Sequence, residues 1–99
     1  MRLSKQQIAI IRQETSKAFG STALVRLFGS RVDDSRRGGD IDLHIETDLQ
    51  SGDAQHADDR LYTALIRRLG DQRIDIVTHT AGNPVRGIDD MAIRTGQVL

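Results

Sequence analysis

Three aspartates are the residues best suited to carry chemistry. Asp40 and Asp42 lie two residues apart in an alternating polar and apolar segment, so on a β-strand their side chains share one face, about 6.5–7 Å apart. Asp75 lies in a later alternating segment and reaches them if the two strands are neighbours. Close carboxylates repel one another by roughly several kcal/mol, which protons or cations must relieve. Hard oxygen ligands favour Mg²⁺ or Mn²⁺, so the pattern predicts a divalent metal site.

The alternative is a solvated strand face. Edge strands often carry charged side chains that discourage pairing with other molecules, and such a face needs no ligand. Aspartate has a low β-propensity, however, and three aspartates in strand interiors are more than surface polarity requires. The metal site is therefore the favoured interpretation of Asp40, Asp42 and Asp75.

A second candidate element is the Gly29-Ser30 pair, which follows the apolar segment ending at Phe28. A strand that ends in Gly and Ser and leads into a turn exposes backbone N–H groups and a hydroxyl, and such groups bind phosphate oxygens. By itself a Gly-Ser dipeptide is common in turns and carries little information. Its interest lies in its distance from the aspartates, because nine residues separate Ser30 from Asp40.

Alternating helix and strand patterns predict the elements that must position these residues. A helix begins after the capping box of Ser4 and Gln7 and ends at Gly20. Strands are predicted over 23–28, 40–46 and 73–79, with a loop or short helical turn over 31–39. A second helix covers 54–68, and a short final helix begins at 88–90 and ends at Gly96. The order predicts an α/β fold, a small mixed β-sheet with helices, in a single domain over 1–99.

The amino-acid composition argues against several classes of function. The 99 residues include 14 basic and 14 acidic ones, which argues against direct nucleic-acid binding through a global positive field. Only one Tyr, two Phe and no Trp are present, too few for a base-stacking platform. The chain has no Cys, no long apolar run and no signal-peptide pattern, so we expect a cytoplasmic protein that does not enter membranes.

Together these motifs resemble the DNA polymerase β-like nucleotidyltransferase superfamily. The shared pattern is a strand, Gly29-Ser30, a spacer, Asp40-Ile41-Asp42-Leu43 on the next strand and a third carboxylate at Asp75. The closing segment 92–99 is similar to the end of the stand-alone minimal nucleotidyltransferases (MNT) of bacteria and archaea. The resemblance covers essentially the whole chain and leaves no further domain.

The resemblance implies a role for each matching residue. Asp40 and Asp42 would hold two divalent ions, Mg²⁺ or alternatively Mn²⁺, and Asp75 would complete the shell of the ion that faces the acceptor hydroxyl. Gly29 and Ser30 would hold the β- and γ-phosphates of a nucleoside triphosphate, with Arg31 as a further phosphate contact. The implied substrate is ATP, which would donate AMP.

Several residues depart from the family pattern or are assigned no role. Gly39 replaces the serine that often precedes the Asp-x-Asp motif, and Asp33 and Asp34 are unusual near a triphosphate, where they pair with Arg36 and Arg37 or are solvated. Arg31 and Arg37 are both candidate phosphate contacts. An exposed loop charge is an equally good interpretation of Arg31 and a better interpretation of Arg37. His44 shares the face of Asp40 and Asp42, which allows a metal role, but the favoured expectation is a strand-end histidine near solvent, with an exposed Glu46 beyond it. His56, His79 and Tyr62 receive no site role.

The acceptor hydroxyl is not specified by these residues. Three short helices cannot cover both faces of a sheet, so we expect an apolar or mixed rim that a partner covers. The resemblance points to a small helical HEPN-type toxin, whose tyrosine would be adenylylated (AMPylation) in a toxin–antitoxin system. Two alternatives stay open: adenylylation of a small molecule with a separate substrate-binding subunit, and a non-catalytic module that binds the toxin.

Overall fold

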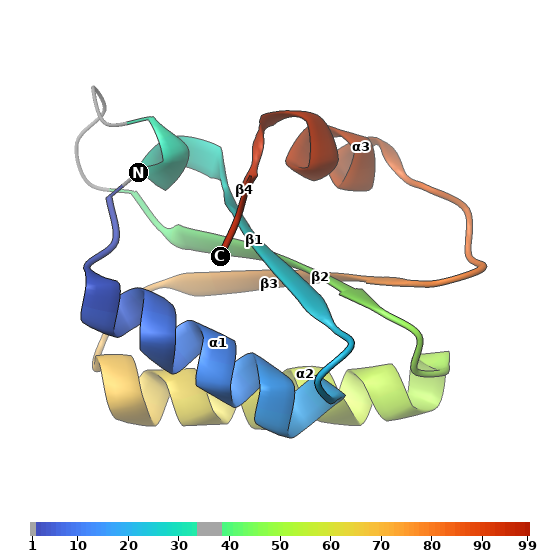
Figure 1. The fold of residues 1–99 in the computed structure, drawn as a ribbon, viewed down its shortest axis with the longest axis horizontal. Coiled ribbons are helices and arrows are strands. Elements are labelled where there is room, and N and C mark those ends of the chain that lie inside the picture. Colours follow the sequence, from blue (N-terminus) through green and yellow to red (C-terminus); the bar gives the residue numbers. More distant parts are fainter. Residues whose placement is uncertain (1, 34–38) are drawn as a thin grey trace.

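The computed structural model describes residues 2–33 and 39–99 and shows a mixed sheet with two helices on one face (Figure 1). Strands lie in the order β3-β2-β1-β4; β2 and β3 are parallel, and the other neighbouring pairs are antiparallel. The α/β class with a small mixed sheet is thus confirmed. In chain order the elements are α1 (Lys5–Phe19), β1 (Leu24–Phe28), the 3₁₀ turn η1 (Gly29–Val32), β2 (Ile41–Thr47), α2 (Ser51–Leu69), β3 (Ile74–Thr80), α3 (Gly87–Thr95) and β4 (Gln97–Val98).

The core lies between the sheet and the helices α1 and α2. The alternation of β2 turns Ile41, Leu43 and Ile45 toward these helices, where all three are completely buried. Leu61 and Leu65, four residues apart on α2, pack into the same cluster. Burial of this apolar face leaves the opposite face of β2 to Asp42, His44 and Glu46, because successive side chains of a strand point to opposite sides.

The structure differs from the sequence prediction mainly at the C-terminus. Residues 97–98 form a fourth strand, β4, which pairs with Arg26 and Leu27 of β1. Two residues are too short to show a period, so the alternation that reveals longer strands could not reveal this one. Helix α2 also begins at Ser51, three residues before the predicted start. The capping box of Ser4 and Gln7 on α1 is present as predicted.

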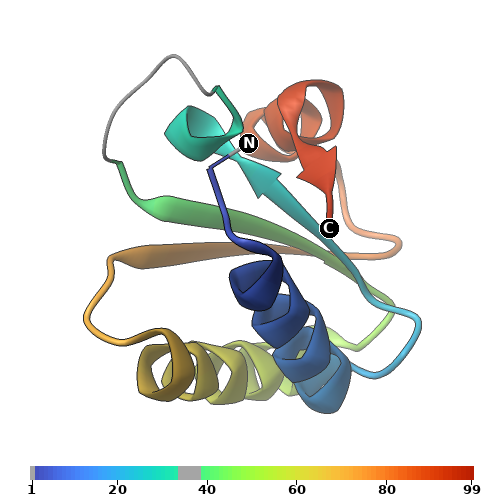
Figure 2. The same ribbon diagram turned by 60° about the vertical axis from the view of Figure 1, so that its left-hand side comes forward.

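Helix α3 lies on the face of the sheet opposite α1 and α2 (Figures 1 and 2) and is held there by a buried polar contact. Asp89 of α3 accepts a hydrogen bond from Nε2 of His44 at 2.8 Å, and both side chains are completely buried. The other partner of Asp89 is Arg86, whose backbone N–H and guanidinium both donate to the carboxylate. These hydrogen bonds, chiefly those from Arg86, hold the pKa of Asp89 well below its usual range.

Expectations for two polar residues of β2 were therefore wrong. His44 is not near solvent, because α3 covers it, and its Nε2 carries the proton that Asp89 accepts. Glu46 is half-buried and not exposed, and its carboxylate bonds Nδ1 of His79 at 2.9 Å. The sequence pattern placed both residues on the correct face but could not show what packs on that face.

Much of α3 is nevertheless exposed, and apolar side chains are exposed with it. Seven large apolar residues are more than a third exposed in the described ranges, and five of them lie between Val85 and Val98. No helix of the described residues is both long enough and apolar enough to cross a membrane. The seven exposed residues are Leu24, Tyr62, Val85, Ile88, Met91, Ile93 and Val98.

Replacing Asp89 with alanine should destabilise the fold by about 2–4 kcal/mol, because His44 would be left buried without its acceptor. Asp90→Ala is the matched control, since Asp90 lies in the same helical turn but its ion pair with Arg94 is exposed. We expect the control to lose less than about 1 kcal/mol. Urea unfolding measures both, and equal losses would contradict the role given to the His44–Asp89 contact.

Candidate functional site

The structure brings Asp40, Asp42 and Asp75 together at one end of the sheet. Asp40 directly precedes β2, Asp42 is the second residue of β2, and Asp75 is the second residue of β3. The parallel register places Asp42 beside Asp75. One carboxylate oxygen from each residue lies within 4.8 Å of the other two. Three oxygens at this spacing are close enough to share one cation.

This convergence follows from the β2-α2-β3 connection. Ile41 and Leu43 on β2, and Ile74 on β3, are buried against the helices, which turns the aspartates between them to the opposite face. The long helix α2 carries the chain back along the sheet, so β3 runs parallel to β2 and the two strands begin at the same edge. Acidic residues at equivalent positions of both strands must then meet.

The three carboxylates of the cluster repel one another. Burial, together with the charges of Asp75 and Asp40, raises the pKa of Asp42 from 3.8 to about 6. Arg73 lies 3.7 Å from Asp40, but its side chain is 85% exposed, so solvent screens most of that attraction. Within the described residues, negative charge at this edge is therefore poorly compensated, and a bound cation would relieve the repulsion.

Gly29 and Ser30 pack directly against this cluster. Gly29 has a φ of +77°, a conformation that favours glycine, and a Cβ at this position would overlap the carboxylate of Asp42. Gly39, with a φ of +91°, meets the hydroxyl of Ser30 in the same way. The turn η1 thus contacts the aspartates from the β1 side, as the spacing of the Gly-Ser pair from the Asp-x-Asp motif suggested.

Arg31 holds this turn in place through its guanidinium. It donates to the carbonyl oxygens of Gly39 and Arg2, at 3.3 and 3.2 Å, and to the side-chain oxygen of Gln72 at 3.4 Å. The backbone N–H of Arg2 in turn donates to the carbonyl of Arg31 at 2.8 Å. Arg31 therefore links the N-terminal segment, the turn and the start of β2, and a phosphate contact would have to replace one of these bonds. The loop residues Asp34, Arg36 and Arg37 lie outside the described residues.

The site offers hard oxygen ligands, beside a turn with backbone and hydroxyl donors. Carboxylates without nitrogen or sulfur ligands suit Mg²⁺ and Mn²⁺ better than Zn²⁺ or copper. The convergence of three carboxylates and the raised pKa of Asp42 both favour the binding of a cation by this cluster. The donor set therefore fits a divalent metal. His56 has no part in the cluster.

Comparisons with known proteins identify no family for this chain. No protein-family model matches the sequence, and none of the curated proteins is significantly similar to it. Its chemistry must accordingly be inferred from the site itself.

The raised pKa of Asp42 predicts a pH-dependent stability in the absence of metal. The folded state binds this proton more tightly than the unfolded state, so the contribution of Asp42 to stability is greatest below its usual pKa of 3.8 and falls as the pH rises through about 6. Asp42→Asn should therefore stabilise the metal-free protein by about 1 kcal/mol at pH 7 and by nearly nothing at pH 4. Urea unfolding in EDTA, with the exposed Asp48→Asn as control, tests this. A destabilised variant at pH 7 would contradict it.

Gly29→Ala should weaken metal binding by the aspartate cluster, because the added methyl group would push the carboxylate of Asp42 aside. Gly70→Ala is a matched control, because Gly70 has a similar φ of +84° but nothing within 4 Å of the added methyl group. Both variants should lose about 1–2 kcal/mol of stability from backbone strain. Mn²⁺ titration calorimetry should show weakened binding only for Gly29→Ala. Equal Mn²⁺ affinities of the two variants would contradict the steric explanation.

Proposed function

We propose that this chain is a metal-dependent nucleotidyltransferase that transfers AMP from ATP to a hydroxyl group. The observation that carries the proposal is the contact of the Gly29-Ser30 turn with Asp42, inside a cluster that Asp40 and Asp75 complete. A phosphate-binding turn beside a carboxylate cluster suits a substrate that is both polyphosphorylated and metal-bound. The sequence resemblance to the minimal nucleotidyltransferases supports the same reaction.

Each residue of the site has a defined task in this proposal. Asp40, Asp42 and Asp75 would hold two Mg²⁺ ions. When bound, these ions neutralise the triphosphate and lower the pKa of the acceptor hydroxyl. Backbone N–H groups of Gly29 and Ser30, with the hydroxyl of Ser30, would bind the β- and γ-phosphates, while Arg31 keeps the turn in place.

The transfer itself needs no protein nucleophile. The acceptor oxygen forms a bond to the α-phosphorus, the bond from that phosphorus to the bridging oxygen breaks, and pyrophosphate leaves. The acceptor proton is lost to solvent or to a carboxylate of the site. The chain's own contribution is to hold the triphosphate and the acceptor in line, which accounts for much of the rate enhancement in phosphoryl-group chemistry.

The acceptor in this proposal belongs to another protein. Five exposed apolar side chains between Val85 and Val98 give the C-terminal part of the chain a surface that a partner can cover. The favoured partner is a small helical HEPN-type toxin in the cytoplasm, modified on a tyrosine. This assignment rests on the sequence resemblance, and the structure adds only the exposed surface.

Two aspartate variants separate binding from chemistry. Asp42→Asn should lose Mg²⁺-dependent ATP binding in calorimetry, because Asp42 is central to the cluster. Asp75→Asn should keep ATP binding but lose transfer, as expected for an interaction needed mainly in the transition state. Intact-mass spectrometry of a co-purified partner with ATP and Mg²⁺ should show added AMP with the wild type and none with Asp75→Asn.

The control for both measurements is Asp48→Asn, since Asp48 is exposed just after β2 and lies outside the cluster. Unchanged ATP affinity in Asp42→Asn would overturn the proposal. An unmodified partner that wild type and Asp75→Asn both neutralise would favour the non-catalytic binding module instead.

A further inference from the structure

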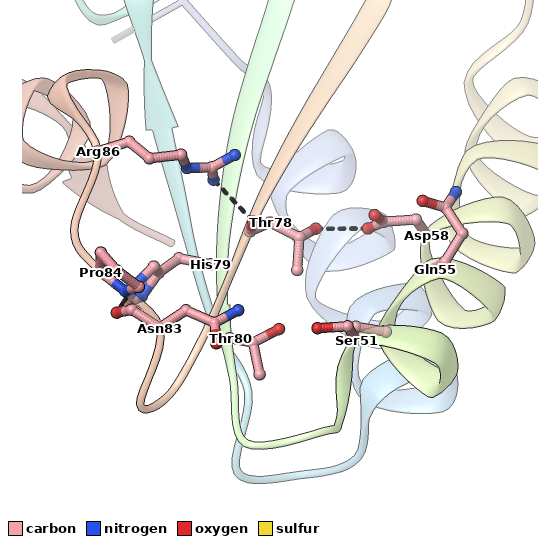
Figure 3. A pocket seen from close by; sticks show the side chains of 10 residues that line it. Ser51, Gln55, Asp58, Thr78, His79, Thr80, Asn83, Pro84 and Arg86 are labelled. Carbon is pink, nitrogen blue, oxygen red and sulfur yellow. Dashed lines mark hydrogen bonds between the residues drawn. The ribbon is translucent and has the colours of Figure 1, made fainter.

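A polar cavity lies at the opposite end of β3 from the aspartates. Its volume is about 390 Å³, within the range of small-molecule sites. Ser51, Gln55 and Asp58 of α2 line one wall, at the i, i+4 and i+7 positions of one helix face, and Thr78 to Thr80 of β3 line another. The loop between β3 and α3 closes the cavity with Asn83, Pro84 and Arg86 (Figure 3).

Thr80 is the residue that points to a ligand. The residue as a whole is only 9% exposed, and its hydroxyl makes no hydrogen bond to any part of the chain that the structure describes. Figure 3 shows this hydroxyl directed across the cavity toward the hydroxyl of Ser51. The hydroxyl is not among the fully buried polar atoms that lack a partner; it is open to the cavity and so available to a ligand that enters there.

The first turn of α2 adds donors beside these two hydroxyls. The N-cap residue, Gln50, makes no side-chain capping bond, and the first backbone bond at this end of the helix runs from Ala54 to Gln50. Among the described residues, the N–H groups of Ser51, Gly52 and Asp53 have no backbone acceptor. They form the positive end of a 19-residue helix.

Two basic side chains, His79 and Arg86, also line the cavity. Both ring nitrogens of His79 face acceptors, the carboxylate of Glu46 and the carbonyl of Asn83, so both must carry protons for both contacts to be hydrogen bonds. These same bonds raise the pKa of His79, with Glu46 as the main cause. The guanidinium of Arg86 donates to the carbonyl of Thr78 at 2.8 Å, beside the cavity.

The far end of the cavity is lined by hydrogen-bond acceptors. Asp58 lies seven residues beyond Ser51 on α2, about 10 Å along the helix. Its carboxylate accepts a hydrogen bond from the hydroxyl of Thr78, and burial raises its pKa. Together with the amide of Gln55, this end presents acceptors, whereas the end at Ser51 and Thr80 presents donors.

We infer that this cavity binds a small phosphorylated molecule, with the phosphate between Ser51, Thr80 and the first turn of α2, and a hydroxyl- or amine-bearing body toward Asp58. The site is separate from the proposed catalytic one. Thr80 lies five residues beyond Asp75 on the same strand, or about 17 Å. Neither the reaction nor the metal is needed for this binding.

Nuclear magnetic resonance titration of the full chain tests the inference directly. The probes are inorganic phosphate, ribose 5-phosphate and ribose, added to Asp42→Asn protein in EDTA at constant ionic strength so that the aspartate cluster does not contribute. We expect saturable shifts of the amide signals of Ser51, Gly52 and Asp53 with ribose 5-phosphate, weaker binding of inorganic phosphate, and no response to ribose alone.

Thr80→Val and Ser51→Ala should each weaken the binding of ribose 5-phosphate by about fivefold or more, the loss expected for a hydrogen bond to a charged group. Ser21→Ala, an exposed serine outside the cavity, should leave the affinity unchanged. Non-saturating shifts, or an affinity that Thr80→Val does not alter, would overturn the site. Equal affinities for the two phosphates would overturn the assignment of the body to the Asp58 end.

Discussion

In the parallel register of β2 and β3, Asp42 lies beside Asp75 at one end of the pair and Glu46 lies beside His79 at the other. This register depends on the apolar face beneath it, because a slip of one residue would turn the buried isoleucines and leucines of β2 to the opposite side. The same constraint that forms the core therefore brings charged side chains together on the other face. Both candidate sites lie along this strand pair.

Three polar residues of β2 lie on the face opposite the core, and the structure accommodates each of them in a different way. His44 is fully buried and satisfied at Nε2 by Asp89, and Glu46 is half-buried and bonded to His79. No cationic side chain of the described residues is paired with Asp42, and burial together with the neighbouring aspartates raises its pKa. Of these three described side chains of β2, Asp42 alone has no compensating charged partner, and this is the reason for proposing that a ligand binds there.

The turn at Gly29 links the aspartate cluster to the rest of the fold. It joins β1 to the carboxylate of Asp42 through a contact that admits no side chain, and Arg31 ties the same turn to the N-terminal segment. Displacement of the turn would therefore move the aspartates as well. A phosphate bound at this turn would lie next to the three aspartates without any large rearrangement, which is the arrangement that the proposed nucleotidyl transfer requires.

The sequence by itself determined the alternating strands, the helices and their caps, and hence the α/β class and the face that Asp40, Asp42 and Asp75 share. These features depend on local periodicity, which neighbouring residues express directly. Other features depend on contacts between residues far apart in the chain. These are the strand β4, the burial of His44 under α3, the hydrogen bond between Glu46 and His79, and the cavity at Thr80. Periodicity shows which face a side chain occupies, but only the packing of α3 and the pairing of β3 decide what meets it there.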